Sequence, residues 1–137
     1  MEKITVLISR ILLAHIYLLA GINKISGYAG TQSYMEAMGV PGELLPLVIL
    51  LEIAGGLALV VGWQTRWAAI GLAGFTALAA ILFHANFGDQ TQMIMFMKNW
   101  AMTGGLLLLA VHGAGELSLD MRRDKATTHK IEKVTVN

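Results

Sequence analysis

The sequence predicts an all-α integral membrane protein, a four-helix antiparallel bundle with both termini in the cytoplasm. Hydrophobic residues make up 55% of its 137 positions and charged residues only 14%, whereas about 25% of a typical soluble domain is charged. Mean hydropathy is +0.62. Four apolar windows approach the roughly 20 residues that a helix needs to cross the hydrocarbon core of a bilayer. The chain therefore requires lipid as its solvent.

Breaks in the apolar pattern separate the predicted helices. The long loop after the first helix contains the turn signal Pro41-Gly42 and has room for a short surface helix over residues 31–38. The two later loops are short, so each joins antiparallel neighbours. After residue 121 the chain becomes charged and loses its apolar pattern. The prediction is one transmembrane domain over residues 1–121, with helices at about 4–25, 44–61, 67–83 and 93–111, and a loosely ordered cytoplasmic tail over 122–137.

Lysine and arginine are distributed unevenly between the two ends of this bundle. One end has only Lys24 and Lys98. The end that carries both termini and the loop between the second and third helices has Lys3, Arg66, Arg122, Arg123, Lys125, Lys130 and Lys133. Because loops rich in lysine and arginine stay in the cytoplasm, both termini are expected there.

Ionisable residues inside the spans are the main functional signal, because each costs on the order of 3 kcal/mol at the centre of a membrane helix. Glu52 lies near the middle of the second window and Arg10 about two turns into the first. The long side chain of Arg10 is expected to pair with Glu52, although helical side chains lean toward their own N-terminus and would draw Arg10 toward the cytoplasm. The pair is either a structural clamp or an internal site that accepts a proton or grips a ligand.

A second polar group is predicted at the outer ends of the helices. Lys24 closes the first helix, His84 closes the third and Lys98 opens the fourth, so an antiparallel bundle brings all three to one surface. Their simplest role is to extend into the headgroup layer. The alternative is a basic pocket at the membrane edge for an anionic or carbonyl-bearing ligand, such as a quinone head group.

Composition and spacing argue against several other functions. The chain contains no cysteine, so it supplies no thiol or thiolate ligand for redox chemistry or metal binding. His15, His84 and His112 fall at different depths and form no metal-binding motif, so no metal site is predicted. A net charge of +1 gives no reason to expect nucleic acid as a partner.

Three segments together resemble a known family: RILLAHIYLLAGINKISGYAGTQSYMEAMGVP, LLEIAGGLALVVGWQTRWAAIGLAGFTALAAILFHANF and MFMKNWAMTGGLLLLAVHGAGELSLD. They closely resemble the DoxX family of small bacterial inner-membrane proteins, especially its YqjF-like branch, up to about Arg123. The residues that carry the resemblance are Arg10, Gly21, Lys24, Glu52, Gly55, Gly56, Thr65, Arg66, Phe83, His84, Lys98 and Asn99.

The resemblance implies a multi-pass protein of the bacterial inner membrane, in a family that includes a subunit associated with a thiosulfate:quinone oxidoreductase. It therefore favours an accessory or membrane subunit of a quinone-linked redox system with no chemistry of its own. Quinone is then the candidate cofactor, and the expected partners are the lipid bilayer, a redox enzyme and a second copy of the chain. Two alternatives remain open: a small transporter in which Glu52 binds a proton, and a non-catalytic membrane scaffold.

Overall fold

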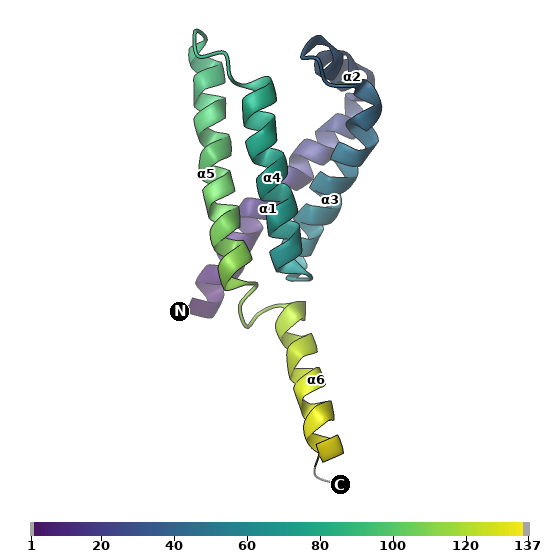
Figure 1. The fold of residues 1–137 in the computed structure, drawn as a ribbon, viewed down its shortest axis with the longest axis vertical. Coiled ribbons are helices and arrows are strands. Elements are labelled where there is room, and N and C mark those ends of the chain that lie inside the picture. Colours follow the sequence, from purple (N-terminus) through teal and green to yellow (C-terminus); the bar gives the residue numbers. More distant parts are fainter. Residues whose placement is uncertain (1, 136–137) are drawn as a thin grey trace.

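The computed structural model describes residues 2–135, and its secondary structure over this range consists of helices alone. This confirms the predicted all-α class. The elements are α1 (Glu2–Ser26), α2 (Tyr28–Ala37), a short 3-10 helix (Gly42–Leu44), α3 (Leu45–Val61), α4 (Thr65–Phe83), α5 (Gln90–His112) and α6 (Leu119–Thr135) (Figure 1).

Within the described range, four helical segments are long and apolar enough to cross a membrane: α1, Gly42–Val61, α4 and α5. They confirm the helices predicted from the four apolar windows, with ends that differ by a few residues. Large apolar side chains point outward from them; Leu47 and Leu50, for example, are each 62% exposed. Lipid solvates such a surface, and the helices satisfy their own backbone hydrogen bonds, so a bilayer can hold them.

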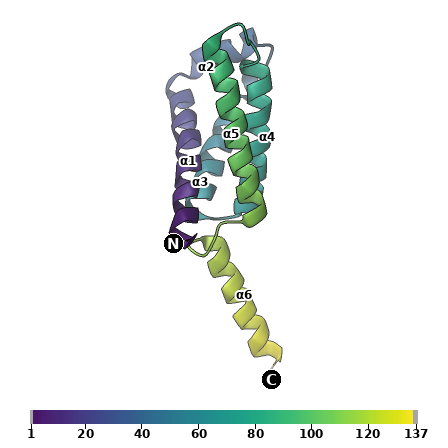
Figure 2. The ribbon, with the colours of Figure 1, turned by 90° about the vertical axis from the view of Figure 1, so that its left-hand side faces the viewer.

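The four long helices lie side by side as two pairs (Figures 1 and 2). α1 packs against α3, α4 packs against α5, and α3 and α4 contact each other. Leu59, Leu72 and Leu106 are fully buried in the core beside Ala14 and Ala69. Small residues such as these alanines let membrane helices approach closely. The start of α1, the α3–α4 turn and the end of α5 meet at one end of the bundle, here called the termini end; the opposite end is the α2 end.

The predicted short helix between the first two spans is present as α2, although it begins at Tyr28, before the expected start. α2 lies across the α2 end of the bundle (Figure 2). Met35 is buried, and the ring of Tyr34 stacks on the ring of Phe83 at the end of α4, with 5.6 Å between centroids. α2 is therefore packed against the long helices on one of its sides.

The prediction of a loosely ordered tail over residues 122–137 is wrong for residues 122–135, which lie in α6. Residues 136–137 lie outside the described range. Ser118 caps this helix, because its hydroxyl accepts a hydrogen bond from the backbone N–H of Met121 (3.2 Å). No glycine or proline interrupts residues 119–135, so their helix propensity is adequate. The polar composition excludes a buried helix but not an exposed one, and α6 extends away from the bundle (Figure 1).

Candidate ligand-binding site

A cavity of about 420 Å³ lies between the helices near the α2 end. Small-molecule sites commonly have volumes of about 300–1,000 Å³. All five helices from α1 to α5 contribute to its lining, which is largely apolar and includes Ile16, Val48, Phe75, Leu78 and Met102. The polar side chains that line it are Tyr17, Lys24, Thr31, Tyr34, Glu52, Thr76, His84 and Asn99.

An ion pair between Lys24 and Glu52 forms the charged part of this cavity. Lys24 Nζ donates to Glu52 Oε1 at 2.8 Å. The Glu52 side chain is only 4% exposed, whereas that of Lys24 is 26% exposed. The second carboxylate oxygen, Glu52 Oε2, is buried and has no hydrogen-bond partner among the described residues. A buried carboxylate oxygen without a donor is costly, so it marks a place where a ligand can contribute one.

Gly21 explains how Lys24 reaches Glu52. A Cβ atom added at Gly21 would lie 2.6 Å from Ile53 Cγ1 and 3.5 Å from Glu52 Cβ, so only glycine allows α1 and α3 to come this close. Lys24 follows on the same face of α1, one turn later. Because its side chain leans toward the N-terminus of α1, it extends back into the bundle toward Glu52.

A buried hydrogen-bonded chain lies beside the ion pair. Tyr17 Oη is 2.6 Å from Thr76 Oγ1, and Thr76 Oγ1 donates to the carbonyl of Leu72 at 2.6 Å. Tyr17 and Thr76 are 4% and 3% exposed. This chain joins α1 to α4 across the cavity and fixes the position of the Tyr17 hydroxyl.

His84 lies where the cavity reaches the end of α4. Its Nδ1 is 2.7 Å from Oε1 of Gln92 in the first turn of α5, and the ring is half-buried. The predicted outer-end group is therefore divided. Lys24 and His84 line the cavity, whereas Lys98 is exposed and is not among its lining residues.

The predicted pairing of Arg10 with Glu52 is wrong. Arg10 is 1% exposed and donates to backbone carbonyls at the termini end: Ala114 (2.9 Å), Leu117 (2.7 Å) and Val60 (3.5 Å). The reason is the lean of helical side chains toward the N-terminus, which takes Arg10 away from Glu52. Arg10 therefore joins α1 to the end of α3 and to the linker before α6.

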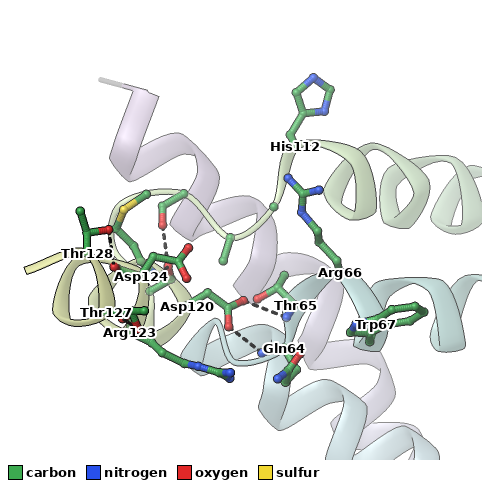
Figure 3. Close-up of a pocket in the computed structure, with 15 residues that line it drawn as sticks. Gln64, Thr65, Arg66, Trp67, His112, Asp120, Arg123, Asp124, Thr127 and Thr128 are labelled. Atoms are coloured by element: carbon green, nitrogen blue, oxygen red, sulfur yellow. Dashed lines mark hydrogen bonds between the residues drawn. The ribbon is translucent and has the colours of Figure 1, made fainter. Parts of the chain in front are cut away.

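A second cavity, of about 680 Å³, lies at the termini end and is shown in Figure 3. Its lining carries both signs of charge, with Arg66, Arg123, Asp120 and Asp124 among its residues. In Figure 3, Asp120 points toward the start of α4. Its carboxylate accepts the backbone N–H groups of Gln64 (2.8 Å) and Thr65 (2.9 Å), which a helix start leaves without internal partners. The residues of α6 thus complete the α3–α4 turn.

The electrostatics of Asp120 fit this structural role. Burial alone would raise its pKa, but the N–H groups of Thr65 and Gln64 and the charge of Arg123 outweigh burial and hold the pKa below its usual range. A carboxylate with a lowered folded-state pKa stabilises the fold above its unfolded pKa of about 3.9, and that contribution is lost as the pH falls through the folded value. The contact is therefore fully effective at neutral pH.

Comparisons with known proteins show which family and which relatives this chain resembles. Residues 5–85 match the DoxX family, a stretch that includes Tyr17, Lys24, Glu52, Thr76 and His84. The chain is 54% identical over 125 residues to the inner membrane protein YqjF of Escherichia coli (strain K12), covering 91% of this chain and 96% of that protein. It is 34% identical over 129 residues to the inner membrane protein YphA of the same organism, covering 88% and 91%. No solved structure is significantly similar.

Proposed function

Because this chain belongs to the DoxX family, we propose that it is an inner-membrane accessory subunit that binds a quinone-class molecule for a redox partner. The observation that carries the proposal is the unpartnered Oε2 atom of buried Glu52 in a largely apolar cavity. A bilayer-soluble ring with one or two polar groups and an apolar tail has the matching chemistry.

The lining residues support a division of roles. Phe75, Leu78 and Met102 offer apolar surface for a ring and part of a tail. Lys24 uses one of its three N–H groups on Glu52 and retains others for a ligand oxygen. A bound quinone would supply two-electron, two-proton carrier chemistry, while the residues of this chain hold and orient it and exclude water.

The membrane topology belongs to the same proposal. The Lys- and Arg-rich termini end lies in the cytoplasm, the four long helices cross the inner membrane as an antiparallel bundle, and residues 122–137 are cytoplasmic. The Glu52 cavity then lies in the outer half of the membrane. α6 extends into the cytoplasm, where it is accessible to a partner subunit.

The experiment that tests this proposal is purification in a mild detergent, followed by mass spectrometry of extracted lipids and co-purifying proteins. We expect about one quinone or quinol per chain, because the cavity has room for one ring. The Glu52→Gln variant is expected to retain less than about a tenth of the quinol, since the hydrogen bond from a quinol hydroxyl to the charged carboxylate is lost.

Glu43→Gln is the matched control, because Glu43 is a carboxylate close in sequence that does not line the cavity. It should retain the wild-type amount of quinone. Purified wild-type protein without quinone, also after reconstitution with added quinone, would contradict the proposed function.

A further inference from the structure

Three polar side chains that line the cavity, those of Glu52, Tyr17 and His84, have hydrogen-bond acceptors left for a ligand. A carboxylate has no hydrogen to donate, and Glu52 Oε1 already accepts from Lys24. The remaining atom, Oε2, is a free acceptor among the described residues. A ligand head group that reaches it can pair with it only by donating a hydrogen.

Tyr17 presents an acceptor as well. The hydroxyl hydrogen of Thr76 goes to the Leu72 carbonyl, so Thr76 cannot also donate to Tyr17. In the contact of 2.6 Å between the two hydroxyls, Tyr17 must therefore be the donor. Its hydrogen is used there, and only the lone pairs of Tyr17 Oη remain for a ligand.

His84 follows the same pattern at the end of α4. Its Nδ1 lies 2.7 Å from Gln92 Oε1, and an amide oxygen only accepts, so Nδ1 carries the hydrogen of the pair. In the neutral ring, Nε2 is then an acceptor. Next to these acceptors stands the ammonium group of Lys24, which is partly exposed and already engaged with Glu52. The half-buried carboxamide of Asn99 and the exposed hydroxyl of Tyr34 also line the cavity and can donate.

We infer that the cavity selects a head group that donates hydrogen bonds, so that it binds a hydroquinone in preference to the corresponding quinone. This inference rests on the proposed function and adds the form of the ligand. The hydroxyls of a hydroquinone can donate to Glu52 Oε2 and to Tyr17 Oη. The carbonyls of a quinone only accept, so they would leave these buried acceptors unpaired. Lys24, Asn99 and Tyr34 can still donate to a carbonyl, so the quinone binds more weakly but is not excluded.

The test uses the full-length protein in detergent and three matched probes: decyl-substituted benzoquinone, its hydroquinone, and the dimethyl ether of that hydroquinone. Titrations are run without oxygen, so that the hydroquinone stays reduced. Because a site built for a donor discriminates against analogues without one, we expect the hydroquinone to bind at least about tenfold more tightly than the other two. The dimethyl ether has the reduced ring of the hydroquinone but no O–H group. It therefore shows whether the preference depends on the hydrogen-bond donor or on the oxidation state of the ring.

Two variants examine the residues behind this preference. Glu52→Gln should bring the affinities of the hydroquinone and the quinone to within about twofold of each other, because a carboxamide both donates and accepts. Tyr17→Phe keeps the ring and removes the second acceptor, so it should reduce the preference without abolishing it. Glu43→Gln, outside the cavity, should leave the preference unchanged.

The outcomes separate this inference from the proposed function. Equal affinities for hydroquinone and quinone in the wild-type protein, or a preference for the quinone, would overturn the inference and leave the proposed function standing. Binding of none of the three probes would overturn both. A wild-type preference for the hydroquinone that survives unchanged in Glu52→Gln and in Tyr17→Phe would also overturn the inference, because other groups would then be responsible.

Discussion

Replacing Arg10 by methionine is expected to lower the free energy of unfolding by about 3–5 kcal/mol. The Arg10 guanidinium is buried and donates to three backbone carbonyls, those of Val60, Ala114 and Leu117. Methionine fills similar space but donates nothing, so these carbonyls lose a charged donor. The measurement is the unfolding midpoint of the purified protein in detergent, by temperature and by denaturant.

Arg122→Met is the control for this prediction, because Arg122 is exposed on α6 and has no side-chain hydrogen bond or ion pair in the described structure. It should change stability by less than about 0.5 kcal/mol. An Arg10→Met protein as stable as the control would show that Arg10 does not join α1 to the α5–α6 linker in the way described.

The second large effect is expected at Lys24. Lys24→Met leaves buried Glu52 without its only described partner. Removing one member of a fully buried pair costs about 3–5 kcal/mol; since Lys24 is partly exposed, we expect about 2–3 kcal/mol here. The double variant Lys24→Met with Glu52→Gln removes the unpaired charge, so most of the lost stability should return. Quinone binding should not return with it, because the double variant lacks both groups that hold the head group.

Lys98→Met provides a matched control, since Lys98 is an exposed lysine that does not line the cavity. It should stay within about 0.5 kcal/mol of the wild type. If Lys24→Met were no less stable than Lys98→Met, the Lys24–Glu52 pair would not contribute to the fold. If the double variant were no more stable than Lys24→Met alone, the unpaired charge of Glu52 would not be the cause of the lost stability.

The helices of the bundle could be predicted because membrane solvation imposes a simple rule on sequence. A span needs an apolar window of defined length, and four such windows are visible without structural information. α6 could not be predicted in this way, since it is polar and leaves no apolar period. Its signals are local: the Ser118 cap and an uninterrupted run of residues compatible with a helix.

The sequence identified several residues of the candidate site one by one, but it did not predict which of them lie together. Glu52, Lys24 and His84 were all identifiable as polar residues in or beside apolar windows. Their grouping depends on how closely α1 approaches α3, which Gly21 decides, and on the direction in which each side chain leans. The same lean that carries Arg10 away from Glu52 carries Lys24 toward it. Tyr17 gave no signal in the sequence, because a tyrosine in a span is common and its partner Thr76 lies on another helix.

Photolabelling with a light-activated quinone analogue in membranes, followed by peptide mapping, would show whether the cavity beside Glu52 is the place where the head group binds. We expect labels on the cavity-lining residues of α1 and α3, which lie within 16–24 and 48–52, and we expect excess hydroquinone to suppress them. Labels that fall instead on outward-facing residues of α5 such as Leu107 and Leu108, and that excess hydroquinone does not suppress, would contradict this expectation.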